Sequence, residues 1–322
     1  MTDQNNKNIM TVCGEIPSSQ LGFCQCHEHI MLQKGKSFEI NPALCIDDPE
    51  LSLQELCLYK QSGGNSLVDC QPVGCGRMAD VLKEISEKSG VSIVSSTGFH
   101  KMQFYPEDHW IYSCNSEELA DIFISELQNG MFVNCDTAFP KIRCSAKAGI
   151  IKTALDSGRM SDNDKRLFTA AAIASKKTRT PIIVHIEKDS DPLGLLDFLK
   201  GQGVAPDWLI FCHMDRAVAD LKVHETVAAQ GVYLEYDTIG RWKYHSDERE
   251  VEIIKSLADA GFENKILLSL DTTRARLKSY GGALGLDYLI TRFIPMLLSS
   301  GLTQAGIDRF TVSNPAAALA RR

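Results

Sequence analysis

Eight short runs of apolar and β-branched residues recur along the chain, and most are followed by a longer segment with apolar residues at helical spacing. We predict strands at 23–30, 66–70, 91–97, 149–153, 181–186, 208–213, 232–236 and 266–270. We predict helices at 78–89, 116–128, 161–176, 193–200, 218–229, 248–260 and 284–298. The first of these helices is closed by Gly90 just before the next strand, which is typical of repeated βα units.

The predicted strands are continuous apolar runs rather than alternating ones, which indicates a parallel sheet buried on both faces. Eight strands with a repeat of about forty residues fit a closed (β/α)8 TIM barrel, an α/β fold. A doubly wound open sheet is the alternative, but no glycine-rich dinucleotide-binding turn follows the first strand. No low-complexity linker divides the chain, so we expect one domain over residues 1–322.

Composition excludes several classes of function. The chain has 322 residues, 44% of them hydrophobic, and a formal charge of −7, which disfavours nonspecific binding to nucleic acid or to an anionic membrane. It has neither a membrane-spanning apolar stretch of about 18 residues nor an apolar leader, so we expect a cytoplasmic protein. The 11 cysteines lie mostly in apolar runs, which is typical of reduced, buried thiols.

Metal-binding side chains close several of the predicted strands. The C-terminal ends of barrel strands meet at one rim, where the active sites of this architecture lie, so we expect these side chains to converge. Strand side chains alternate between faces, so the histidines of the first strand both point into the barrel and Glu28 points away. The six converging residues are His27, His29, Lys152, His185, His213 and Asp271.

Lys152 is unexpected among these residues because a buried ammonium is desolvated and repelled by cations. One interpretation is a salt bridge to Asp271. The other, which we favour, is an amine of lowered pKa that adds carbon dioxide and becomes a carbamate, whose two oxygens bridge two metal ions.

These positions resemble the phosphotriesterase-like branch of the amidohydrolase superfamily. The matching segments span nearly the whole chain in the family's order: GFCQCHEH at 22–29, SLVD at 66–69, STG at 96–98, AGIIK at 148–152, VH at 184–185, CHMD at 212–215, LD at 270–271 and NPA at 314–316. The resemblance implies two metal ions bridged by carboxylated Lys152 and a hydroxide. It assigns the more buried ion to His27, His29 and Asp271, and the more exposed ion to His185 and His213.

Two such cations would lower the pKa of a bridging water, and the exposed ion would polarise the scissile carbonyl or phosphoryl group. Asp271 is then the candidate general base and later the acid for the leaving group. Zinc suits the imidazole-rich set, with manganese and cobalt as alternatives.

Cations are concentrated in the segments 236–245 and 271–282, which follow the last two strands. Barrels frequently build phosphate sites from these loops. We predict that Lys243 and Arg274 grip a phosphate together and that Tyr280 or Lys278 adds a donor. The alternative is that these are solvated charges balancing the acidic residues between 247 and 250.

Cationic loops favour an anionic substrate, so the chain looks most like the family members that open phosphorylated sugar lactones, and we expect a five-carbon aldonolactone phosphate as substrate. One alternative is a carboxylesterase or phosphotriesterase acting on neutral esters, and a second is a non-catalytic binding barrel. No organic cofactor is expected. Barrels of this kind often pair, which makes a homodimer a further expectation.

The other histidines and the cysteines beside His27 have simpler interpretations. His224 and His245 are expected to face solvent, and His100 and His109 to lie on a long loop over the substrate or at the surface. Cys24 and Cys26 are interpreted as packing residues, with Cys26 on the face opposite His27.

Overall fold

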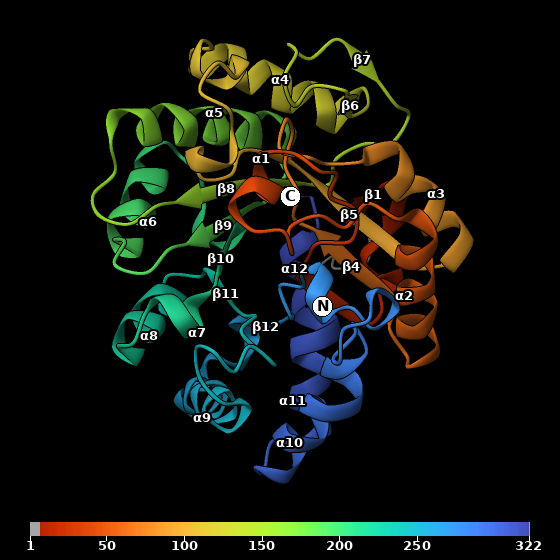
Figure 1. The fold of residues 1–322 in the computed structure, drawn as a ribbon. Helices are drawn as coiled ribbons and strands as arrows, with labels where there is room; N and C mark the ends of the chain where they lie inside the picture. The colour runs from red at the N-terminus through yellow and green to blue at the C-terminus, as the bar shows by residue number, and fades with distance from the viewer. Residues whose placement is uncertain (1–6, 322) are drawn as a thin grey trace.

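Eight parallel strands form a barrel in the computed structural model, which describes residues 7–321 (Figure 1). Neighbouring strands pair in the order of the sequence, and the last meets the first where the Asp271 N–H donates to the His27 carbonyl oxygen at 3.1 Å. This confirms the predicted (β/α)8 barrel. The strands are β3 (Cys24–Glu28), β4 (Ser66–Asp69), β5 (Ser92–Gly98), β8 (Ile150–Leu155), β9 (Ile182–Ile186), β10 (Leu209–Cys212), β11 (Tyr233–Tyr236) and β12 (Ile266–Leu268).

Helices surround the barrel, as Figure 1 shows. All seven predicted segments contain a helix, although the last begins with a π-helical turn at Leu289–Phe293. The main helices are α2 (Pro49–Gln61), α3 (Ala79–Ser89), α4 (Ser116–Gln128), α5 (Asp162–Thr178), α6 (Pro192–Gly201), α8 (Leu221–Ala229), α9 (Asp247–Leu257) and α10 (Ile294–Ser299). Capping boxes at Asn115 and Ser161 begin α4 and α5, and left-handed Gly90 ends α3.

The 13-residue helix α2 was not predicted from the sequence, and neither were several short elements. They are α1 (Lys36–Ile40), α7 (Met214–Ala217), α11 (Gln304–Asp308), α12 (Asn314–Leu319), an antiparallel hairpin of β1 (Asn8–Thr11) and β2 (Gly14–Pro17), and a second hairpin of β6 (Phe132–Val133) and β7 (Ile142–Arg143). None of the described helices combines the length and the apolar character needed to cross a bilayer.

The interior of the barrel is filled with apolar side chains below the functional rim. Ile150, Ile183 and Leu267 point inward, while their neighbours along each strand pack outward against the helices. Ile9 from the hairpin and Leu319 from α12 close the lower end of this inner core. Because side chains alternate, the next inward positions after these residues hold the polar groups of the rim.

The first strand departs from the expected alternation. The pairing register between β3 and β4 shifts between Gln25 and Glu28, as at a β-bulge. Cys24 and Cys26 therefore belong to the buried inner core, while His27 lies in the rim with the other polar side chains. The packing role of the two cysteines is confirmed, but the placement of Cys26 opposite His27 is wrong, because the bulge re-aims the strand between them.

Candidate metal centre

The structure brings the six predicted side chains together at the C-terminal rim of the barrel. His27 lies near the end of β3, Lys152 and His185 lie in β8 and β9, and His213 and Asp271 follow β10 and β12. The Nζ of Lys152 lies 3.2 Å from Nε2 of His27, and Nε2 of His29 lies 3.5 Å from Oδ1 of Asp271. Five of the six line a cavity of about 220 Å³, and Lys152 is completely buried beneath it.

A ring nitrogen of His185 and a ring nitrogen of His213 face each other at a distance that suits a shared cation. Nε2 of His213 lies 2.8 Å from Nδ1 of His185. The other nitrogen of each ring meets a carboxylate, Asp237 at 2.7 Å for His213 and Glu187 at 3.2 Å for His185, and these contacts place the ring protons there. Burial lowers the pKa of His185 to about 4, and burial and Arg216 lower the pKa of His213 well below its ordinary value. Two lone pairs therefore converge, which fits a shared metal ion.

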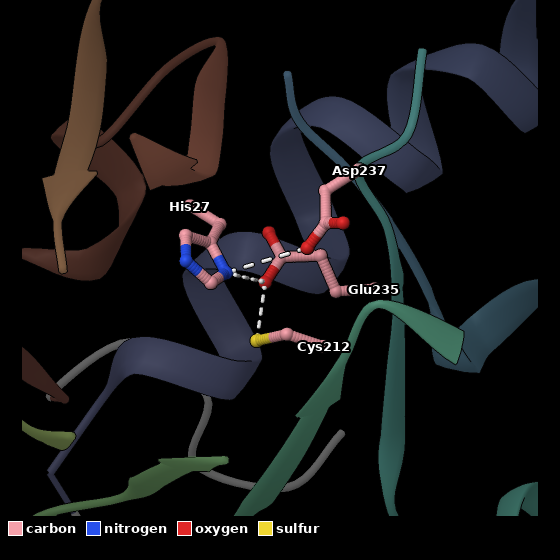
Figure 2. Close-up of side chains that lie close together, drawn as sticks. All are labelled: His27, Cys212, Glu235 and Asp237. Atoms are coloured by element: carbon pink, nitrogen blue, oxygen red, sulfur yellow. Dashed lines mark hydrogen bonds and ion pairs between the residues drawn. The ribbon is translucent and has the colours of Figure 1, made fainter. Parts of the chain in front are cut away.

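His27 is supported by carboxylates from the neighbouring strand β11. Its Nδ1 lies 3.3 Å from Asp237 and 3.6 Å from Glu235. Figure 2 draws both contacts as dashed lines. A carboxylate at Nδ1 leaves Nε2 as the free ligand atom, turned toward Lys152 and Asp271. The Sγ of Cys212 donates to Glu235 at 3.0 Å, and the Ser269 hydroxyl donates to the same carboxyl group at 2.7 Å, so Glu235 is held below the ring.

Lys152 has the environment that the carbamate interpretation needs. Among the described residues no acidic side chain forms an ion pair with its Nζ, so the salt bridge to Asp271 that we had considered is not observed. The side chain is fully buried and directed at His27. An ammonium in this position would be uncompensated, whereas a carbamate would supply anionic oxygens to the cluster.

Asp271 is oriented by two arginines. Its Oδ2 receives Arg216 at 3.1 Å and Arg241 at 3.0 Å, which leaves Oδ1 facing His27 and His29. Burial alone would raise the pKa of Asp271, but Arg241, His29 and Arg216 outweigh it and hold the pKa well below its ordinary value. The carboxyl group is therefore ionised and able to bind a cation or accept a proton.

Two of these residues have strained backbones. His213 and Asp271 adopt left-handed conformations with φ of 63° and 49°, which non-glycine residues rarely do. His213 directly follows β10, and Asp271 lies three residues after the end of β12. Strain of this kind persists only where the surroundings enforce it, and it is typical of functional positions.

The four predicted phosphate-binding residues have different surroundings. Lys243 is exposed and lines the cavity, whereas the other three are not among its lining residues. Arg274 pairs with Asp47 at 3.1 Å and stacks on the Tyr280 ring, although its neighbour Thr273 lines the cavity. The Tyr280 hydroxyl donates to the Asp48 carbonyl oxygen at 2.7 Å, and Lys278 pairs with Asp287 at 2.6 Å.

Several residues of the site were not identified from the sequence. They are Asp237, Glu235, Glu187, Arg216 and Arg241. One signal was available, because Glu235 is a charged residue within a buried strand. His100 also lines the cavity, with its ring 5.3 Å from that of His185.

Two other histidines, His109 and His224, are buried, and a third, His245, is partly buried. His224 is completely buried, where its nitrogens contact Tyr236 and the Val218 carbonyl oxygen, so the prediction that it faces solvent is wrong. His109 is buried against Tyr105 and Trp110. The side chain of His245 is only 15% exposed, which also corrects the solvent-facing prediction, since it turns toward Glu250.

Comparison with known proteins places this geometry in a family. The phosphotriesterase family model matches residues 7–319. A phospho-furanose lactonase of Mycoplasmopsis synoviae is 32% identical, with 98% of this chain and 92% of the relative covered.

Solved structures agree. The crystal structure of an amidohydrolase from Mycoplasma synoviae has a TM-score of 0.92 at 31% identity, covering 98% of this chain and 93% of that one. A lactonase from Listeria monocytogenes has a TM-score of 0.89 at 26% identity, covering 98% and 99%. The chain therefore belongs to the phosphotriesterase family and is a hydrolytic enzyme that acts on ester bonds.

Proposed function

We propose that this enzyme opens the lactone ring of a phosphorylated five-carbon sugar with the help of two divalent metal ions. The close approach of Nε2 of His213 to Nδ1 of His185 is the observation that supports a metal-dependent reaction most directly. The name of the Mycoplasmopsis relative, a phospho-furanose lactonase, supports the substrate class.

The six clustered side chains would hold the ions. His27, His29 and Asp271 fit the more buried ion, His185 and His213 fit the more exposed one, and Lys152 as a carbamate would bridge them. When bound, two such cations lower the pKa of water and polarise an ester carbonyl. Zinc suits this imidazole-rich set, and manganese or cobalt could also occupy it.

Asp271 would move the proton in this reaction. As the water oxygen bonds to the carbonyl carbon, Asp271 accepts the proton of that water. As the bond between this carbon and the ring oxygen breaks, Asp271 returns the proton to the ring oxygen, giving the open hydroxy acid. Arg216 and Arg241 support this role because they keep the carboxyl group ionised between turnovers.

Lys243 is the side chain best placed to recognise the phosphate. Lys101, Arg216 and Arg241 also line the cavity, but each is paired with a carboxylate. Within residues 7–321, Lys243 forms no ion pair and contacts only the face of Tyr244 as a cation. We propose that it binds the phosphate with Arg274, which would exchange its exposed contact with Asp47 for the substrate.

Substitution of Lys243 and Arg274 tests whether the substrate carries a phosphate. In K243A and in R274A we expect kcat/KM for an aldonolactone 5-phosphate to fall about 10- to 100-fold, because each variant loses a charge-assisted contact of about 1.5–3 kcal/mol. The same lactone without phosphate should be hydrolysed at the wild-type rate. Steady-state kinetics with both substrates measures the difference.

Lys255 on α9, which pairs with Asp259 at 2.7 Å away from the cavity, gives the matched control K255A. Unchanged kinetics of K243A and R274A on the phosphorylated lactone would contradict the phosphate clamp. Faster hydrolysis of neutral esters by the wild type would favour the esterase alternative, and the absence of any turnover after metal loading would favour a binding barrel.

A further inference from the structure

A second group of potential metal ligands lies outside the six-residue cluster. It consists of Asp215 at the start of α7, His245 at the end of the loop after β11, and Glu250 in the first turn of α9. One ligand atom from each residue lies within 4.8 Å of the other two. Asp215 and Glu250 are buried, and no residue is shared with the six-residue cluster.

The ring of His245 is oriented by a backbone contact. Its Nδ1 lies 3.1 Å from the Ser246 carbonyl oxygen, which can only accept a hydrogen bond, so the ring proton is on Nδ1. The other ring nitrogen, Nε2, lies 3.1 Å from Oε2 of Glu250. Ring nitrogens that bind metals show this pattern, with the opposite N–H donated to a carbonyl or carboxylate.

Glu250 lacks the donors that a buried carboxylate requires. Its side chain is completely buried, and neither of its oxygens receives a hydrogen bond from the described residues. Asp215 adjoins it, with its own oxygens held by the backbone N–H groups of Arg216 at 2.8 Å and Thr238 at 2.6 Å. Burial and the neighbouring Asp215 raise the pKa of Glu250 well above its ordinary value. A positive charge between the three side chains would satisfy all of them.

The six-residue cluster shows the same pattern. There, too, a ring nitrogen lies close to another potential ligand atom, with Nε2 of His213 2.8 Å from Nδ1 of His185. Two ligand atoms about 2.1 Å from a tetrahedral ion lie about 3.4 Å apart, so the 3.1 Å contact of His245 with Glu250 is close to that spacing.

We propose that Asp215, His245 and Glu250 form a third metal site, which binds one divalent cation of the zinc type. One imidazole and two carboxylates favour zinc or manganese over magnesium, which prefers oxygen ligands only. Three protein ligands leave a position for water.

The ion would connect three elements that shape the entrance to the cavity. Asp215 lies two residues after His213, Glu250 lies on α9, and His245 ends the loop that carries Arg241 and Lys243. The ion would hold this loop against the barrel and act as a positioning element, remote from the reacting atoms.

Metal content measures the proposal directly. After loading with excess Zn²⁺ and gel filtration, we expect three zinc ions per wild-type chain by mass spectrometry, and two in E250Q and in H245Q. E248Q is the matched control, because Glu248 is exposed on the same turn of α9, and it should keep three. The double variant H185A/H213A loses ligands of the six-residue cluster. We expect the triple variant H185A/H213A/E250Q to bind one zinc ion fewer than this double variant.

H245Q protects the test against misfolding, since it leaves both buried carboxylates in place. Saturation of the wild type at two ions, or an unchanged zinc content in folded H245Q, would overturn the third site while leaving the two-metal proposal intact. Loss of binding in H185A/H213A alone bears on the two-metal proposal, so the two failures are distinguishable.

Discussion

Asp237 controls the ligand atoms of two rings at once. It accepts from Nδ1 of His213 at 2.7 Å and faces Nδ1 of His27 at 3.3 Å, so one carboxylate sets the tautomer of both histidines. Burial would raise the pKa of Asp237, but His213 and His27 hold it well below its ordinary value. The residue is therefore a permanent acceptor on the inner face of the site.

Replacing this carboxylate with an amide should weaken metal binding. An amide NH2 group facing Nδ1 favours the wrong tautomer, so we expect D237N to lose about 10- to 100-fold in zinc affinity, as outer-shell substitutions typically do. Competition with a coloured chelator gives the dissociation constant. E126Q removes another fully buried carboxylate, the partner of Arg77 at 2.5 Å, and should lower stability without changing zinc affinity. Equal affinities for D237N and the wild type would contradict the orienting role.

The six clustered residues could be predicted because each ends a strand of a recognisable pattern. Asp237 could not, because in the sequence it looks like the first residue of a loop, and its contact with His27 exists only once the barrel has closed. Arg216 and Arg241 were missed for the same reason: their partner Asp271 comes from a different strand end.

At the scale of elements, seven helical segments followed from apolar spacing, but α2 (Pro49–Gln61) and the bulge in β3 did not. The alternation of one strand predicts which side chains share a face, whereas a bulge depends on how two strands pair. The close approach of β5 to β8 also depends on how these two strands pair, so it could not be predicted from either strand alone. Gly98 has a φ of 97°, and a Cβ there would lie 1.9 Å from the carbonyl oxygen of Lys152.

Substitution of Gly98 therefore tests whether the close packing of β5 against β8 stabilises the fold around Lys152. We expect G98A to lose about 3–5 kcal/mol of unfolding free energy, from a strained backbone and a clash that displaces Lys152. Gly90 also has positive φ, but no atom lies within 4 Å of an added Cβ, so G90A should cost about 1–2 kcal/mol. Urea denaturation of both variants measures the difference, and equal losses would show that the clash is relieved without cost.

The whole molecule separates chemistry from stability along the barrel axis. The polar rim lies at the C-terminal ends of the strands, and the lower end is closed by Ile9, Leu21 and Leu319 in one buried core. Substitutions at the two ends should therefore affect different properties.

Leu319 in α12 is completely buried at the lower end. We expect L319A to lose about 2–4 kcal/mol of unfolding free energy while kcat/KM stays at the wild-type value below the melting transition. L298A on α10 provides the comparison, because Leu298 is 37% exposed and its truncation should cost less than about 0.5 kcal/mol. A fall in kcat/KM for folded L319A would mean that the two ends are coupled.

The lower end also holds the two ends of the described chain against each other. The backbone N–H of Arg321 donates to the Asn8 carbonyl oxygen at 3.0 Å, and its guanidinium pairs with Glu15 at 3.2 Å. The polypeptide is thus nearly a ring in space, and a short peptide bridging these positions would make it a covalent one. New termini could then be opened in a surface loop between a helix and a strand, which would give a circularly permuted enzyme. A reporter domain inserted into the bridging peptide would lie at the lower end of the barrel, on the side opposite the cavity.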